Sequence, residues 1–179
     1  MKNIPNLITV IRLVLSVFLF FITDNWTLFL IIYFLCGASD VLDGFLARQF
    51  HLQTRTGARL DSLADFLFFF AAFFRMLFSY GLAVPVPVIW GTVLIALIRF
   101  LNLFITKKKF RLPGILHTIG NKLSGIIFFF ACPAAVFMGS LPVWVIFIPL
   151  LSALEETFIL LKTDSYDPDI RSFHDLLKK

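Results

Sequence analysis

Four aspartates lie at the edges of two strongly apolar stretches, where charged side chains are rare. Asp40 and Asp43 are three residues apart, and Asp61 and Asp65 are four residues apart. On a helix, each spacing places its two carboxylates on one face. Four carboxylates held together repel one another, and a bound divalent cation would remove that repulsion. Oxygen ligands without His or Cys suit Mg²⁺ or Mn²⁺, with Ca²⁺ as a further option, so the pattern predicts a metal site.

The residues between the two aspartate pairs add features of a diphosphate-binding site. Gly44 and Gly57 allow a ligand or another helix to come close to the backbone, and Ala47 keeps the same face small. Arg48 carries a planar cation that suits phosphate oxygens. The alternative is a set of interhelical salt bridges, in which the aspartates pair with three nearby arginines: Arg48, Arg55 and Arg59. Four acids on two membrane helices exceed that structural need, which favours the binding site.

The composition is that of an integral membrane protein. The 179 residues are 59% hydrophobic and 15% charged, with a mean hydropathy of +0.91. A soluble domain has about 45–50% apolar and about 25% charged residues. The net charge of +5 does not indicate nucleic-acid binding, because the basic residues lie in short loops and not along a hydrophilic face. Beside a membrane such residues set the topology and attract anionic lipid headgroups.

The apolar pattern predicts an all-α fold with six transmembrane helices. Each expected span is long enough to cross a bilayer; the ranges are 6–23, 26–47, 61–80, 84–106, 121–138 and 142–162. Lys and Arg gather on alternate sides of these spans, so both termini and the 48–60 and 107–120 loops are expected in the cytoplasm. Residues 1–162 are therefore expected to form one membrane domain that carries the aspartates, followed by a short cytoplasmic tail over 163–179.

Most of the charges inside the expected spans fall at a similar depth. With a helix rise of about 1.5 Å per residue, they lie roughly 5–11 Å inside the cytoplasmic boundary; the residues are Arg12, Asp40, Asp65, Arg99 and Glu155. Such a layer predicts one polar cavity that opens to the cytoplasm. Arg75 lies toward the opposite face, where its side chain is expected to extend to the membrane surface.

The segment from Asp40 to Asp65 resembles a known family signature. It reads D-x2-D-G-x2-A-R-x8-G-x3-D-x3-D, with eight fixed residues over 26 positions. This pattern is similar to that of the CDP-alcohol phosphatidyltransferases, which have six transmembrane helices and carry the motif at the cytoplasmic ends of the second and third. The opening segment, from Pro5 to Arg12, is similar to the start of the smaller bacterial members.

The resemblance implies a role for each residue of the motif. Asp40, Asp43 and Asp61 correspond to ligands of Mg²⁺ or Mn²⁺, and Asp65 corresponds both to a contributor to the metal site and to the general base. The CDP moiety would be held by Asp40, Asp43, Gly44, Ala47, Arg48, Gly57 and Asp61. The implied reaction transfers a phosphatidyl group from CDP-diacylglycerol to an alcohol and releases CMP. The family also implies a homodimer in the cytoplasmic membrane, with the active site facing the cytoplasm.

A second group of cations gives the best indication of the acceptor alcohol. A phosphorylated acceptor needs cations near the metal site, and the candidates are Arg99, Lys107, Lys108, Arg111 and Lys122. Glycerol 3-phosphate is therefore the preferred acceptor. The lysines and Arg111 would equally serve topology and lipid headgroups, so phosphatidylglycerol, as in cardiolipin formation, or a serine- or inositol-phosphate acceptor remains an alternative.

A small cation transporter or channel is the alternative from another class of protein. It would need polar residues along a path across the whole bilayer. Apart from Arg75, the charges inside the spans lie in the cytoplasmic half, and the sequence shows no broken-helix repeat of the kind that transporters use. The sequence therefore favours the enzyme.

Overall fold

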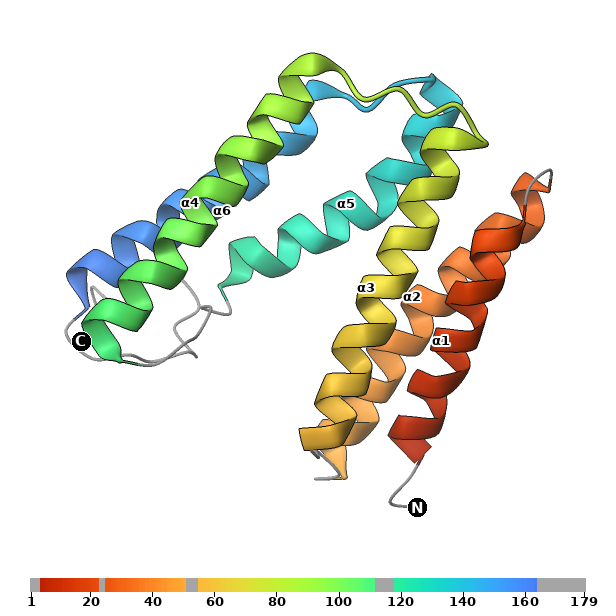
Figure 1. The fold of residues 1–179 in the computed structure, drawn as a ribbon, viewed down its shortest axis with the longest axis horizontal. Helices are drawn as coiled ribbons and strands as arrows, with labels where there is room; N and C mark the ends of the chain where they lie inside the picture. Colours follow the sequence, from red (N-terminus) through yellow and green to blue (C-terminus); the bar gives the residue numbers. More distant parts are fainter. Residues whose placement is uncertain (1–3, 23–24, 51–54, 112–117, 164–179) are drawn as a thin grey trace. The chain divides into compact units, whose positions relative to one another are not determined.

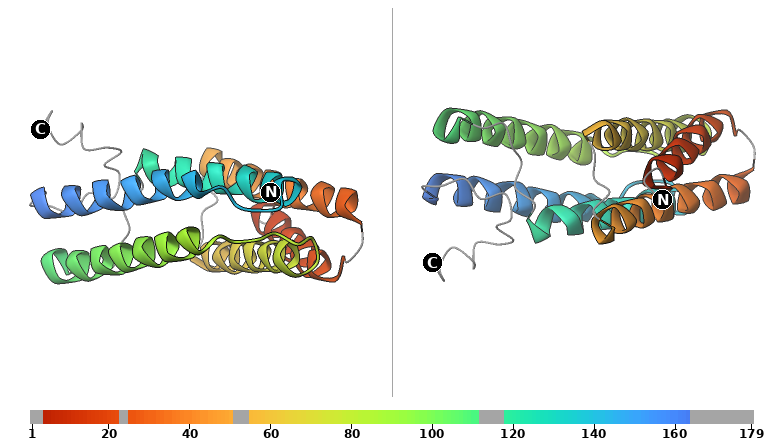
Figure 2. Two further views of the ribbon diagram at one scale, coloured as in Figure 1. Left: turned by 90° about the horizontal axis from the view of Figure 1, so that it is seen from above. Right: turned by 90° about the horizontal axis from the view of Figure 1, so that it is seen from below.

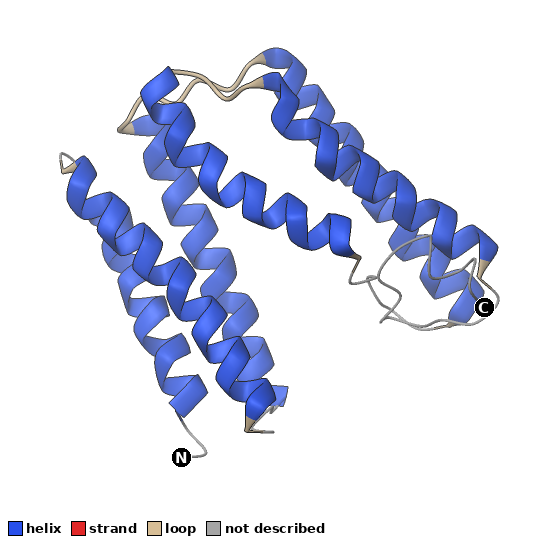
Figure 3. Cartoon of the chain, turned by 180° about the vertical axis from the view of Figure 1, so that it is seen from behind, coloured by secondary structure: helices blue, strands red, loops and turns tan. Residues whose placement is uncertain are grey.

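The computed structural model of the protein describes residues 4–22, 25–50, 55–111 and 118–163. These segments are helical apart from turns and short connections (Figure 3). The chain divides into two compact units, Met1–Leu82 and Ala83–Lys179, and each is described by itself.

The first unit contains three helices, and α1 makes most of the contacts among them. They are α1 (Ile4–Phe21), α2 (Trp26–Gln49) and α3 (Arg55–Phe78). Helix α1 packs extensively against both α2 and α3, which contact each other far less. Figure 1 shows the start of α1, the end of α2 and the start of α3 at one end of this unit. A side chain near the start of α1 can therefore contact residues on both of the other helices.

Arg75 stabilises the other end of the first unit. Its side chain is buried, and Nε donates a hydrogen bond of 2.8 Å to the carbonyl oxygen of Ile22, with a second bond from Nη2. The prediction that Arg75 extends to the membrane surface was wrong. Ile22 directly follows α1, where carbonyl groups have no partner within the helix, and the guanidinium satisfies one of them.

The second unit is built around α6. It contains α4 (Val86–Phe110), α5 (Ile119–Met138), the short 3₁₀ helix η1 (Val143–Ile146) and α6 (Phe147–Lys162). Helix α6 packs against α4 and α5, and Figure 2 shows α4 and α6 side by side. The segment before α4 and the segment between α5 and η1 pair at one end of the unit. There the Ala83 N–H donates a hydrogen bond to the Gly139 carbonyl oxygen at 3.1 Å.

Polar contacts inside the second unit join α4 to α6. The Asn102 amide donates to the Ala153 carbonyl oxygen at 3.1 Å, and the Thr157 hydroxyl donates to the Asn102 side-chain oxygen at 2.8 Å. Lys109 Nζ donates to the carbonyl oxygens of Leu160 and Leu161, both at 3.0 Å. Because the last carbonyls of a helix lack intrahelical partners, this lysine caps α6.

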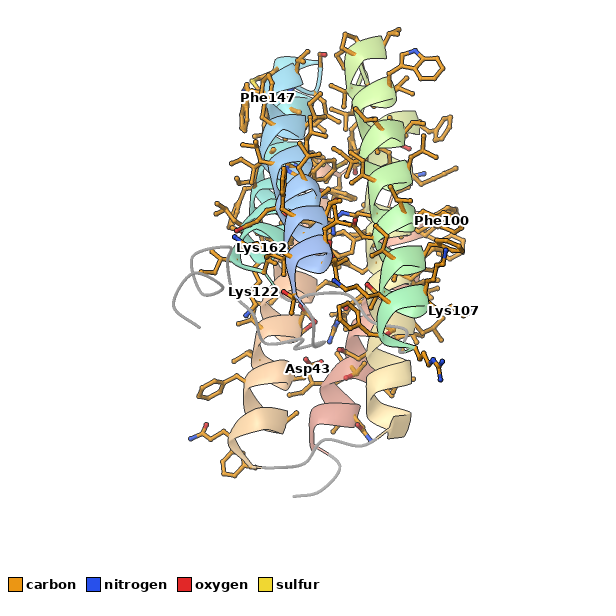
Figure 4. The ribbon with its side chains drawn as sticks, turned by 90° about the vertical axis from the view of Figure 1, so that its left-hand side faces the viewer. Asp43, Phe100, Lys107, Lys122, Phe147 and Lys162 are labelled. Atoms are coloured by element: carbon orange, nitrogen blue, oxygen red, sulfur yellow. The ribbon has the colours of Figure 1, made fainter. Side chains whose placement is uncertain are left out.

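The chain is an all-helical membrane protein. Four segments among the described residues are long and apolar enough to cross a membrane: Trp26–Ala47, Val86–Phe110, Ile119–Met138 and Val143–Lys162. Large apolar side chains lie exposed along them, such as Phe100 on α4 and Phe147 on α6 (Figure 4). These surfaces are typical of helices that contact lipid. The two other expected spans are not among these four segments. The span 6–23 corresponds to α1, which is apolar but shorter, and the span 61–80 corresponds to α3, which carries several charges.

Two glycines of α5 provide a matched test of the packing between α5 and α6. A Cβ atom at Gly120 would lie 2.9 Å from Ser152 Oγ and 3.0 Å from Ser152 Cβ, whereas a Cβ at Gly125 would meet nothing within 4 Å. We expect Gly120→Ala to lower the free energy of unfolding by about 1–3 kcal/mol through overpacking. Gly125→Ala should leave it unchanged or raise it, because alanine is the better helix former.

Thermal unfolding of the two variants in detergent measures this difference. The expected order of Tm is Gly125→Ala equal to or above the wild type, with Gly120→Ala below both. Equal Tm values for the two variants would contradict the close approach of α5 and α6 at Gly120.

Candidate active site

All four aspartates of the motif bind one arginine, Arg12 of α1. Nη1 donates to Asp40 at 2.9 Å and to Asp65, and Nη2 donates to Asp61 at 2.9 Å and to Asp43. Each terminal nitrogen therefore joins one carboxylate of α2 to one carboxylate of α3. The position of α1 between these helices makes this arrangement possible. We refer to these four acids as the aspartate cluster.

The aspartate cluster has a buried floor and an open rim. The side chain of Arg12 is 0% exposed and that of Asp43 is 5% exposed, whereas the other three carboxylates are 38–48% exposed. Asp43, labelled in Figure 4, also accepts a hydrogen bond of 3.0 Å from the buried hydroxyl of Thr9. The rim carboxylates are thus the ones that a ligand can reach directly.

The rim carboxylates fit a divalent metal ion. Asp40, Asp61 and Asp65 each offer one oxygen, and these three atoms lie within 4.8 Å of one another. All of them are hard oxygen donors, which suit Mg²⁺, Mn²⁺ or Ca²⁺. The buried guanidinium of Arg12 among these acids shows independently that this position favours positive charge. Asp43 faces Thr9 and Arg12 at the floor of the same cluster.

The small residues predicted to hold CDP lie within one helical turn of the aspartate cluster in the sequence. Gly44 and Ala47 are partly buried on α2, and Ala47 follows Asp43 by four residues. Gly57 is partly buried in the first turn of α3, four residues before Asp61. The side chain of Arg48 lies outside the described residues. So do the side chains of Arg55 and Arg59, which were the other partners in the salt-bridge alternative.

The predicted acceptor-phosphate residues all belong to the second unit. Arg99 of α4 is partly exposed and lies 3.8 Å from Glu156 of α6, whose side chain is 3% exposed. Lys107, Lys108 and Lys122 are exposed, and Figure 4 shows Lys107 near the end of α4. Arg111 is the C-cap of α4, with a left-handed φ of 58°. Arg99 is therefore the one candidate for which the structure gives a buried acidic partner.

Arg12 was expected among the charges inside the spans, but no role in the site was predicted for it. Thr9 was not singled out, and neither was Ser16, whose hydroxyl donates to the Arg12 carbonyl oxygen at 2.7 Å. The spacing of these three residues could have indicated their common location, because positions 9, 12 and 16 share one face of a helix. All three side chains are buried. A polar stripe on an otherwise apolar first span was thus an available indication that α1 contributes to the site.

Comparison with known proteins identifies the family. The profile of the CDP-alcohol phosphatidyltransferases matches residues 2–155, and the chain therefore belongs to this family, as the motif predicted. No solved structure matches it.

Three similar curated proteins carry the name CDP-diacylglycerol–glycerol-3-phosphate 3-phosphatidyltransferase. One from Pseudomonas fluorescens is 38% identical over 97 residues, which is 50% of this chain and 50% of that protein. One from Aquifex aeolicus is 40% identical over 70 residues, 38% of this chain and 39% of the relative. One from Escherichia coli K12 is 40% identical over 68 residues, 35% and 37% of the two chains. The matched regions thus span half or less of each relative.

Proposed function

We propose that the protein transfers the phosphatidyl group of CDP-diacylglycerol to glycerol 3-phosphate and releases CMP, as a phosphatidylglycerophosphate synthase does. The observation that carries this proposal is the convergence of all four motif aspartates on one point between α1, α2 and α3. Membership of the family and the name shared by the similar proteins support it.

The aspartate cluster would hold Mg²⁺ or Mn²⁺, with Asp40, Asp43, Asp61 and Asp65 as the ligand set. Such an ion neutralises charge on the diphosphate of the donor lipid. The small residues Gly44, Ala47 and Gly57 would leave room for the nucleotide. Arg48, which directly follows Ala47, would bind its phosphates. The aspartates at the same helix ends would complete the CDP site.

Asp65 is the proposed general base. It lies on the open rim of the aspartate cluster, where an acceptor can reach its carboxylate. It takes the proton of the acceptor hydroxyl while that oxygen forms a bond to the lipid-linked phosphorus. The bond from this phosphorus to the CMP oxygen breaks, and CMP leaves with the bonding electron pair.

The proposed topology has six spans, with both termini and the active site on the cytoplasmic side of the cell membrane. Its support is the alternation of basic loops with loops that lack Lys and Arg. Residues 1–162 would form the catalytic membrane domain and 163–179 the cytoplasmic tail. We also propose that the enzyme acts as a homodimer, as the family resemblance implies.

A panel of acceptors tests the proposed reaction. Purified protein in detergent is given CDP-diacylglycerol, Mn²⁺ and one of four alcohols: glycerol 3-phosphate, phosphatidylglycerol, serine or inositol phosphate. We expect CMP and a new phospholipid with glycerol 3-phosphate. CMP with a different alcohol alone would reassign the acceptor, and no CMP with any of them would reject the reaction.

Arg99 is the preferred residue for binding the acceptor phosphate, because it is a partly exposed guanidinium held beside a buried carboxylate. We expect Arg99→Gln to raise the KM for glycerol 3-phosphate roughly tenfold, as loss of a charge-assisted hydrogen bond implies. The KM for CDP-diacylglycerol should change little. Steady-state kinetics with each substrate varied in turn measures both values.

Glu156→Gln is the control for the lost ion pair. It breaks the pair with Arg99 but keeps the cation, so the KM for the acceptor should stay near the wild-type value. If Arg99→Gln and Glu156→Gln change this KM alike, Arg99 has a structural role only.

A further inference from the structure

Arg12 holds the position that a metal ion would take in the proposed site. Its two terminal nitrogens contact all four carboxylates of the aspartate cluster. Its side chain is fully buried, and Nε has no hydrogen-bond partner among the described residues. Among the described residues, the hydrogen bonds of this guanidinium therefore all go to the aspartate cluster.

We propose that Arg12 is the internal counter-cation of the aspartate cluster. Without a divalent ion, it neutralises part of the negative charge and keeps the carboxylates of α2 and α3 at ligand spacing. When the ion binds, Arg12 competes with it for the same oxygens. This inference rests on the proposed metal site and adds a positioning residue to it.

The geometry explains the first part of this role. Each terminal nitrogen connects α2 to α3, through Asp40 and Asp65 at Nη1 and through Asp43 and Asp61 at Nη2. The two helices make few contacts of their own. With the guanidinium removed, four acids would face one another with no cation between them, so the metal-free cluster is expected to lose stability until a divalent ion replaces the missing charge.

Charge explains the second part of the role. Four carboxylates and one guanidinium leave a net charge of −3, so the aspartate cluster still attracts a divalent ion. The ion and the guanidinium repel each other when both are near the same oxygens, and this repulsion is stronger beside a fully buried guanidinium than it would be in bulk water. Arg12 therefore weakens metal binding while it stabilises the metal-free protein. A purely structural arginine that only orders the ligands would have the opposite effect on metal affinity.

Binding of Mn²⁺ to purified protein in detergent tests the proposal, with free Mn²⁺ measured by electron paramagnetic resonance. The variants are Arg12→Met and Arg12→Gln, which remove the charge. We expect the Kd for Mn²⁺ to fall roughly tenfold or more, because the metal-free state loses its buried ion pairs and the bound state does not. The control is Arg75→Met, which removes another buried arginine of the first unit and should leave this Kd unchanged.

Thermal unfolding gives a second readout. The metal-free Arg12 variants should unfold at lower temperature than the wild type, and Mn²⁺ should raise their Tm more than it raises that of the wild type. Variants that fold only when Mn²⁺ is present would support the proposal in the same way.

Three outcomes would overturn the proposal. The first is an unchanged Kd for Mn²⁺ in a folded Arg12 variant, and the second is a raised Kd. The third is failure of both variants to fold even with Mn²⁺, because the bound ion should replace the missing positive charge. Absence of Mn²⁺ binding by the wild type is a different result. It would reject the metal site of the proposed function itself.

Discussion

Asp65→Asn is expected to reduce the rate of CMP release roughly a thousandfold, within the range that general acid–base catalysis contributes. Asparagine keeps the shape of the side chain but cannot accept the proton of the acceptor hydroxyl. The other three acids of the aspartate cluster remain, so binding of Mn²⁺ and of CDP-diacylglycerol should be partly retained. The loss should therefore appear mainly in kcat.

The measurement combines CMP release with Mn²⁺ binding on the same preparation. Asp169→Asn is the matched control, because it makes the same chemical change in the segment 163–179, which carries no site prediction. It should behave as the wild type does. Full activity in Asp65→Asn would show that another group takes the proton.

Asp61→Asn is expected to weaken Mn²⁺ binding by roughly a hundredfold or more, since even partners of metal ligands contribute 10–100-fold to affinity. Asp61 offers one of the three oxygens that lie within 4.8 Å of one another. An amide oxygen keeps the geometry but loses the charge that attracts the ion. CMP release should fall with the bound metal and recover in part at high Mn²⁺ concentration.

Ser62→Ala is the control for Asp61→Asn. Ser62 is the next residue of α3 and its side chain is exposed. The Kd of the Ser62→Ala protein for Mn²⁺ should therefore match that of the wild type. An unchanged Kd in Asp61→Asn would remove Asp61 from the ligand set. The direction of change is also informative, because Arg12→Met in the same cluster is expected to tighten binding and Asp61→Asn to weaken it.

The sequence predicted the helices well because their apolar stretches are long and turn signals separate them. The expected span 121–138 lies within α5 (Ile119–Met138), and 142–162 covers η1 and α6. Two helix ends were less accurate. Helix α3 was expected to begin at residue 61, after a loop over 48–60, and it begins at Arg55. The end of α4 also differs from the prediction. Its C-terminal end was expected at residue 106, and the helix continues to Phe110. The hydrophobic pattern ends there, but lysine is a good helix former, so Lys107, Lys108 and Lys109 continue the helix.

The aspartate pairs were predictable as pairs, because helical spacing alone places each pair on one face. Their common contact with Arg12 was not predictable, since it depends on α1 lying between α2 and α3. No local pattern determines which of the three helices of the first unit takes the middle position. The same limit explains Arg75, whose partner is a carbonyl group 53 residues away in the chain. In both cases the sequence identified the unusual charge, and only tertiary packing identified its partner.

The metal dependence of CMP release tests the proposed reaction at the aspartate cluster most directly. Protein freed of divalent ions with a chelator is given CDP-diacylglycerol and glycerol 3-phosphate, and Mn²⁺ is then titrated in. We expect no CMP without the ion, CMP and phospholipid in equal amounts once Mn²⁺ is present, and neither product when glycerol 3-phosphate is left out. Release of CMP at the full rate without a divalent ion, or no release at any Mn²⁺ concentration, would contradict the proposed reaction.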